Sequence, residues 1–246
     1  MLIVALDTTS RPGSCAVARD GVVLTEEGGD PTRDQAARLP GELIAVLMTV
    51  GVALHDVDAF AVATGPGSFT GLRIGIASMQ GLAFAHGKPL IGVSALDALA
   101  GIAGAVGPVG AAADLSTPAS ARIATWVDAW RGDVFAATYE EDRRLEPPVV
   151  ARPADLLRGM GVGPTLFIGS GVASYRDLIE GAMGAGARVA DPPAPALAGM
   201  IARLASATYL AGHRPGPHAI RPIYVRRPDA VLARLARQES TGGHAD

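Results

Sequence analysis

The sequence predicts an α/β protein, and two observations carry that prediction. Three short apolar runs separated by turn residues open the chain, and from about residue 33 onward helical and strand patterns alternate. Hydrophobic residues make up 49% of the 246 residues and charged residues 18%, which favours a sizeable core and argues against global disorder. This length allows one large domain or two modest ones.

The opening runs predict a meander of three strands. Residues 2–6 are almost all apolar and end in Asp7-Thr8-Thr9-Ser10, which indicates a buried strand feeding a polar turn. Residues 14–18 and 22–26 follow, and Arg19-Asp20-Gly21 is the expected hairpin turn between them.

An alternation of helices and strands comes next. We expect a helix over residues 33–50, because apolar residues recur at helical spacing and Gly51 can end it; Pro40 lies early in this helix. A strand at 59–64, a helix at 69–86, a strand at 90–93 and a short helix from Ser94 or Ala95 complete this half.

A glycine-rich turn, residues 65–75 (GPGSFTGLRIG), joins the strand at 59–64 to the next helix. Gly65 and Gly67 permit unusual backbone angles, and Ser68 or Thr70 can cap the helix. Neither common phosphate-binding fingerprint fits, since no Gly-Lys-Ser/Thr ends the turn and Thr70 stands where a dinucleotide motif needs its third glycine. In the helix, Gly71, Gly75 and Ser78 form a stripe of small residues, which favours close packing within the chain or with a partner over a ligand site.

The second half is less regular. A Gly/Ala-rich crossing at 101–110 precedes expected strands at 109–114, 122–129 and 133–139, the last two joined at Arg131-Gly132. Further expected elements are a helix at 153–158, a strand at 166–168, a helix at 196–211, a strand at 220–225 and a mobile tail.

Composition bounds the chemistry. A net charge of −3 argues against a protein that binds nucleic acid without a partner protein, so any tRNA contact is expected to be indirect. The single cysteine, Cys15, excludes an internal disulfide and fits a reducing compartment, and no apolar run is long enough to span a membrane, so we expect a cytoplasmic protein. The five histidines form no metal-binding pair, and no G-x-S-x-G motif supports a hydrolase.

Several motifs resemble one family. Residues 65–75, the opening residues 2–9 (LIVALDTT), the segment 128–135 (DAWRGDVF) and the segment 222–226 (PIYVR) together resemble the TsaB (YeaZ) family of bacterial proteins that help build threonylcarbamoyladenosine in tRNA. The resemblance implies a two-lobed actin-like ATPase (ASKHA, RNase H-like) fold that is degenerate in catalysis. The expected first lobe is 1–104, completed by 205–227; the second is 105–204; and 228–246 is a flexible tail.

The resemblance also implies a function. The chain would be a non-catalytic subunit that binds and activates TsaD, which transfers threonylcarbamoyl to N6 of adenosine 37 of tRNA. TsaE, an ATPase, would join them, TsaC would make the adenylate, and the chain alone would form a homodimer. No cofactor or metal is expected for the isolated chain, although ATP or ADP with Mg is compatible with the complex. Where the family often has a histidine near the start of the first long helix, this chain has Asp34.

Two sets of candidate residues follow. The helices at 33–50 and 69–86 are expected to form the partner face, and we expect Gly75→Leu to impair partner binding more than folding. The partner-binding candidates are Leu39, Leu43, Val46, Leu47, Phe69, Gly71, Leu72, Gly75, Ser78 and Met79. The candidates for a nucleotide or cleft site are Asp7, Thr8, Gly65, Gly67, Ser68, Asp128 and Arg131.

The cleft candidates have alternative interpretations. Asp7 lies where related kinases hold metal and phosphates, but ATP-using relatives carry a glycine at the position of Thr9. A carboxylate that caps its own turn is therefore the favoured interpretation of Asp7. Asp128 and Arg131 either pair at the surface or shape the cleft. The turn Gly169-Ser170-Gly171 is more simply a turn than an adenosine contact.

The rival function is an enzyme. A stand-alone actin-like ATPase or small-molecule kinase would clasp a nucleotide between Asp7, the turn at 65–71 and the turn at 169–171. A third alternative is a proteolytic regulator of TsaD.

Overall fold

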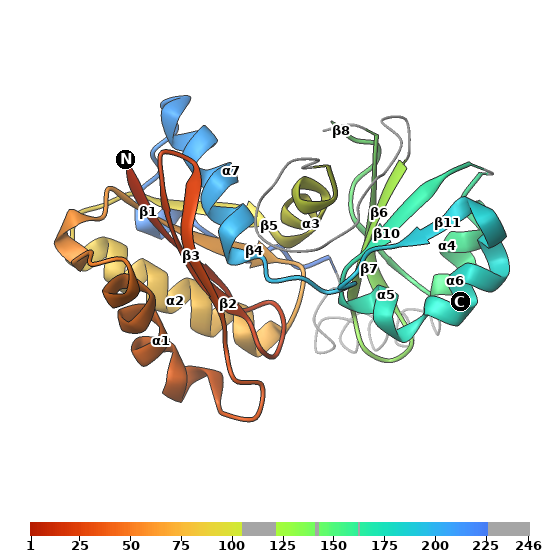
Figure 1. The fold of residues 1–246 in the computed structure, drawn as a ribbon, viewed down its shortest axis with the longest axis horizontal. Helices are drawn as coiled ribbons and strands as arrows, with labels where there is room; N and C mark the ends of the chain where they lie inside the picture. The colour runs from red at the N-terminus through yellow and green to blue at the C-terminus, as the bar shows by residue number, and fades with distance from the viewer. Residues whose placement is uncertain (105–121, 141–142, 162, 226–246) are drawn as a thin grey trace, which may run out of the picture.

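The computed structural model describes residues 1–104, 122–140, 143–161 and 163–225. Within them the chain forms two lobes, each built on one mixed β-sheet (Figure 1). The expected strand at 109–114 and the tail at 228–246 lie outside the described residues.

The first sheet has the order β3-β2-β1-β4-β5. It contains the expected meander, now with the bounds Leu2–Asp7 (β1), Ser14–Arg19 (β2) and Val22–Gly28 (β3). The two further strands, Ala59–Gly65 (β4) and Leu90–Ser94 (β5), run parallel to β1. Because β1 and β4 lie inside the sheet and helices cover both of its faces, both strands are buried along their whole length.

Helices cover both faces of this sheet. Gln35–Thr49 (α1) and Phe69–Ala85 (α2) lie side by side on one face and enclose a core with the side chains of Val4, Phe60 and Met79 (Figure 1). Ala95–Gly104 (α3) and Ala198–Leu210 (α7) lie on the other face. The expected lobe boundary at residue 204 falls inside α7, whose packing against β1 and β2 places the whole helix with the first lobe.

The second sheet has the order β11-β10-β6-β7-β8. Its central hairpin is Arg122–Asp128 (β6) with Val134–Glu140 (β7), and Arg143–Arg144 (β8) and Val149–Ala151 (β9) both pair with β7. Thr165–Ile168 (β10) and Ala187–Val189 (β11) run parallel to β6. The helices Pro153–Gly159 (α4), Ser170–Ser174 (α5) and Arg176–Met183 (α6) cover the face turned away from the first lobe (Figure 1).

The two sheets repeat one topology. Each begins with an antiparallel meander (β1-β2-β3, then β6-β7-β8) and adds two parallel strands beside the first strand of that meander (β4 and β5, then β10 and β11). This duplication is the architecture of the actin-like ATPase fold, as expected.

The lobes share a core. Helix α3 leaves the first sheet and packs between the two sheets against β6 and β10, so apolar residues from both lobes belong to one cluster (Figure 1). The Tyr139 hydroxyl of β7 donates a hydrogen bond of 2.7 Å to Asp97 of α3, and Arg144 contacts the same carboxylate at 3.3 Å. The connection between lobes is therefore both apolar and polar.

The C-terminal segment returns to the first lobe, but the expected strand at 220–225 is not formed. After the 3-10 helix Pro217–Ala219 (η3), the chain runs along α2, where the Gln80 side chain donates to the carbonyls of Pro217 and Ile220. The Ile223 N–H donates to Thr64 O at 2.7 Å. These isolated hydrogen bonds do not form the regular ladder of a β-strand, so the segment is an extended connection and not a sixth strand of the sheet.

Candidate functional site

Asp7 ends β1 with its carboxylate turned into its own turn. Asp7 Oδ1 accepts hydrogen bonds from the Thr9 N–H at 2.8 Å and the Thr9 hydroxyl at 2.7 Å. The side chain is 3% exposed. Burial raises the pKa of this carboxyl, and the two hydrogen bonds from Thr9 oppose that rise. The capping interpretation of Asp7 therefore accounts for its contacts.

The glycine-rich turn packs against residues 7–9, which we call the Asp7 corner. The Ser68 N–H donates to Thr9 O at 2.8 Å, and a Cβ at Gly67 would lie 2.6 Å from Thr9 Cβ. Gly65 has a φ of +104°, which only glycine adopts readily. The Ser68 hydroxyl caps α2 by accepting the Gly71 N–H at 3.1 Å. The structure thus brings together five of the cleft candidates, Asp7, Thr8, Gly65, Gly67 and Ser68, but packs them against one another.

The small residues of α2 pack against the same corner. A Cβ at Gly71 would lie 2.1 Å from Thr8 O, and a Cβ at Gly75 would lie 2.1 Å from Thr8 Oγ1. Thr8 is buried, and its hydroxyl has no hydrogen-bond partner among the described residues. These two glycines therefore serve the approach of α2 to β1, and the expectation that Gly75→Leu acts mainly on partner binding is corrected to an effect on folding.

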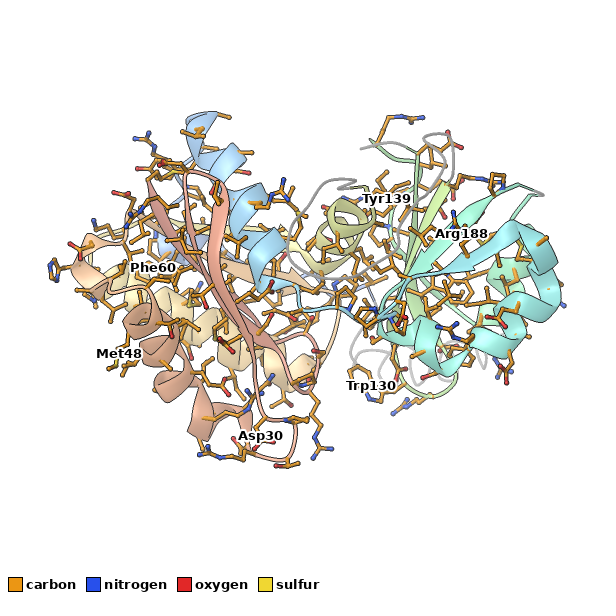
Figure 2. All side chains as sticks on the ribbon, viewed as in Figure 1. Asp30, Met48, Phe60, Trp130, Tyr139 and Arg188 are labelled. Carbon is orange, nitrogen blue, oxygen red and sulfur yellow. The ribbon has the colours of Figure 1, made fainter. Side chains whose placement is uncertain are left out.

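Asp128 and Arg131 belong to the second lobe, at the β6–β7 hairpin. Asp128 Oδ1 accepts the Trp130 N–H at 2.8 Å, and the Asp128 N–H donates to Ser170 Oγ at 3.1 Å. Trp130 and Arg131 have φ values of +56° and +58°, and Trp130 is 52% exposed near the tip of the hairpin (Figure 2). Both of these hydrogen bonds stay within the second lobe and do not reach Asp7.

The turn at 169–171 also has a packing role. Gly169 has a φ of +122°, and a Cβ there would lie 2.2 Å from Trp126 O; a Cβ at Gly171 would lie 2.8 Å from Val134 Cγ1. These glycines let α5 pack directly on the β6–β7 hairpin, as the turn interpretation requires.

Most of the expected partner-binding side chains face inward. The two helices direct their apolar stripes toward the sheet, as amphipathic helices on a sheet do. The side chains of Leu39, Leu43, Val46, Leu47, Leu72 and Met79 are all at most 5% exposed, and Gly71 and Gly75 are buried. Ser78 is half-buried, and Phe69 is 44% exposed. The assignment of the eight buried residues to direct partner contact is therefore corrected: they form the core beneath the helices.

The outward side of these helices is also apolar, and sequence reasoning missed it. Met48 is 73% exposed, Ile44 53% and Phe84 82%, and Met48 lies on the outer side of α1 (Figure 2). We define the outer α1/α2 face by the exposed residues at helical spacing on the two helices: Ala37, Gly41, Ile44 and Met48 of α1, and Arg73, Ala77, Gly81 and Phe84 of α2. The available signal was a second set of residues, all uncharged except Arg73, on helices that already had a complete inward stripe.

Three further observations bear on the site. Asp34, where the family often has histidine, is the N-cap of α1 and accepts the N–H groups of Ala36 and Ala37. Within the described ranges, no three His, Cys, Asp or Glu residues gather as a metal site would require, and no helix is long and apolar enough to cross a membrane.

A cavity of about 330 Å³ lies in the second lobe between β7 and α4, away from the candidates above.

The repeated topology and the shared central helix define a two-lobed protein of the actin-like ATPase fold. Among solved structures, the activator of the 2-hydroxyisocaproyl-CoA dehydratase from Clostridium difficile has this fold, with a TM-score of 0.54 at 12% identity over 91% of this chain and 100% of that one. A structure from Pseudomonas aeruginosa described as similar to the peptidase YEAZ has a TM-score of 0.71 at 27% identity, over 92% of this chain and 99% of that one.

Sequence comparisons identify the family. Residues 30–183 match the family model for TsaD, tRNA N6-adenosine threonylcarbamoyltransferase. The Escherichia coli tRNA threonylcarbamoyladenosine biosynthesis protein TsaB is 32% identical over 189 residues, which cover 72% of this chain and 75% of that protein. The chain belongs to the TsaB (YeaZ) family.

Proposed function

We propose that the chain takes part in the synthesis of tRNA threonylcarbamoyladenosine as a subunit that binds and activates a TsaD transferase. The observation that carries the proposal is the outer α1/α2 face, on which three large apolar side chains are more than half exposed. Exposed apolar patches of this kind on a protein surface mark interaction sites.

The match to the TsaD family model supports the choice of partner. The matched residues 30–183 contain both α1 and α2, so a TsaD chain is expected to carry two corresponding helices. Two related chains that meet through the same pair of helices form an approximately twofold interface. Without that partner, two copies of this chain are expected to pair through the same face.

The closed Asp7 corner supports an accessory role. The turn at 65–68 and α2 pack directly on Thr8 and Thr9, which leaves the Asp7 carboxylate within its own turn. We therefore propose that catalysis resides in the TsaD partner, that TsaE joins the complex, and that any ATP or ADP with Mg acts in the complex. Contact with tRNA would be indirect.

The activity test is reconstitution. TsaC, TsaD and TsaE of the same organism are incubated with tRNA, with and without this chain, and modified adenosine is measured by mass spectrometry. Dependence of the modification on this chain supports the proposal. Modification that proceeds equally without it overturns the accessory role, and ATP turnover by the isolated chain with Mg would favour the nucleotide-dependent enzyme.

The interface test uses substitutions on the outer face. Met48→Asp and Phe84→Asp each place a charge where an apolar contact is proposed, and we expect each to weaken binding to TsaD by about 2 kcal/mol or more. Val22→Asp is the matched control, because Val22 is 64% exposed on the edge strand β3 and lies outside this face. Normal binding by both face variants would refute docking through α1 and α2.

A further inference from the structure

Arg73 is the one charge on α1 and α2 that has no opposite charge beside it within the described residues. The two helices carry only three charged side chains, Arg38, Glu42 and Arg73. Arg38 is buried and reaches both carboxylate oxygens of Glu42, at 2.6 and 2.7 Å. That pair neutralises itself, so Arg73 supplies the net charge of the side chains within the two helices.

Aromatic side chains hold the Arg73 guanidinium in place. Its Cζ lies 4.0 Å from the centre of the Phe69 ring, and its Nε donates to the Tyr224 hydroxyl at 3.4 Å. The Phe69 and Tyr224 rings are themselves 5.4 Å apart. A guanidinium stacked on an aromatic ring loses less conformational freedom when it binds, and its planar fork matches a carboxylate.

Arg73 lies in line with the apolar part of the outer α1/α2 face. Positions 73, 77, 81 and 84 of α2 are all exposed and follow one another at helical spacing. A partner that covers Phe84 and Ala77 therefore also removes water from Arg73. Burying an unpaired cation is unfavourable unless the partner provides an anion.

We infer that Arg73 pairs with a carboxylate of the TsaD partner and that this pair selects TsaD over a second copy of this chain. The inference rests on the proposed function, since it names the chemistry of the partner at the same face. A second copy brings no unpaired carboxylate within its own α1 or α2, and its Asp34 at the N-cap of α1 already accepts the Ala36 and Ala37 N–H groups. It also adds a second Arg73 without an opposite charge to the interface. Charge complementarity would thus act as a specificity element against self-association.

The test compares two affinities of one variant. Arg73→Gln is expected to weaken binding to TsaD by about 30-fold or more, the effect of truncating one member of a buried charge pair. The same variant is expected to self-associate at least as strongly as the wild type, measured by sedimentation. Arg73→Lys should retain part of the TsaD affinity, because it keeps the charge and loses the planar fork.

Two control variants isolate the charge of Arg73. Tyr224→Phe removes only the hydrogen bond to Arg73 and should change TsaD binding by less than about 3-fold. Arg19→Gln removes the same charge at the end of β2, beside the N-terminal end of β1 and therefore at the opposite end of the sheet from the start of α2. It should leave both affinities unchanged.

The outcomes separate this inference from the proposed function. If Met48→Asp breaks the complex but Arg73→Gln binds TsaD within about 3-fold of the wild type, the proposed function stands and the carboxylate pairing is wrong. If Arg73→Gln weakens TsaD binding and self-association equally, selection by Arg73 is also wrong. If neither Met48→Asp nor Arg73→Gln affects binding, docking through this face fails as a whole.

Discussion

Thr8 Oγ1 lies where the side chain of any larger residue at position 75 would begin: a Cβ built on Gly75 falls 2.1 Å from this oxygen. The contact fixes the distance between α2 and β1, and hence the position of the outer α1/α2 face above the sheet. Stability measurements on α2 therefore test the packing that supports the proposed interface.

Gly75→Ala is expected to lower the free energy of unfolding by about 1 to 3 kcal/mol, because the added methyl group forces α2 away from Thr8. Gly81→Ala is the matched control in the same helix, where a Cβ meets nothing within 4 Å. That variant should gain about 1 kcal/mol from helix propensity. Urea unfolding of both variants measures the difference, and equal stability of the two would show that α2 does not approach Thr8 closely.

Asp7→Asn is expected to stabilise the protein at neutral pH. Burial raises the pKa of Asp7 above the ordinary value of 3.8 for an aspartate, so the folded state holds this proton more tightly than the unfolded chain. Stability from this group is then greatest below the unfolded pKa and is lost as the pH rises through the folded pKa. Asparagine removes the cost of the buried charge, so the gain should be largest at neutral pH and above.

Melting temperatures from pH 3 to pH 8 check this expectation for Asp7→Asn and the wild type. The stability difference should shrink toward acid pH, since asparagine can still accept both hydrogen bonds from Thr9. Glu27→Gln, at an exposed position of β3, controls for removal of a carboxylate. A wild type more stable than Asp7→Asn at pH 7 would mean that the ionised carboxylate has a stabilising contact beyond Thr9.

Trp130→Asn is expected to raise the stability by about 1 kcal/mol. Trp130 adopts a φ of +56°, in the left-handed region that asparagine tolerates better than an aromatic residue, and its ring is half exposed. Trp130→Gly should change the stability in the same direction. Lower stability of both variants, measured by thermal unfolding, would assign a stabilising contact to the indole ring.

Tyr139→Phe is expected to cost about 0.5 to 1.5 kcal/mol, because it deletes the hydrogen bond to Asp97 that joins the two lobes. Asp97 keeps Arg144 as a partner at 3.3 Å. Tyr209→Phe is the control, since no hydrogen bond of the Tyr209 hydroxyl is found among the described residues. Urea denaturation of both variants is the measurement. An unchanged midpoint for Tyr139→Phe would mean that this hydrogen bond does not stabilise the contact between the lobes.

Local patterns sufficed for most of the first lobe. Alternating apolar runs and turn residues located β1 to β5, and helical spacing located α1 and α2 to within two residues at each end. The short elements β8, β9, α5, α6 and β11 were not predicted, because few of their residues follow a clear period. The strand expected at 220–225 failed because an apolar run does not reveal whether a neighbouring strand has a free edge to pair with.

The candidate site was only partly predictable. The chain order placed Asp7 and the Gly65 turn at the same sheet edge, as observed, but periodicity cannot say whether an apolar stripe faces a core or a partner. Leu43 and Met79 are buried for that reason, while Met48 and Phe84 carry the exposed apolar surface. The role of Gly75 depended on Thr8, a residue 67 positions earlier, and sequence spacing gives no such distance.

The helix α3 shared by both sheets has a mechanical consequence. Lobes that meet through a large apolar contact do not rotate freely, and the cluster around α3 together with the Tyr139–Asp97 bond gives such a contact. A protein that closes on a nucleotide needs a hinge between its lobes, whereas the core shared by these two lobes opposes such a rotation. A partner that binds the first lobe would thus meet the second lobe in a defined position.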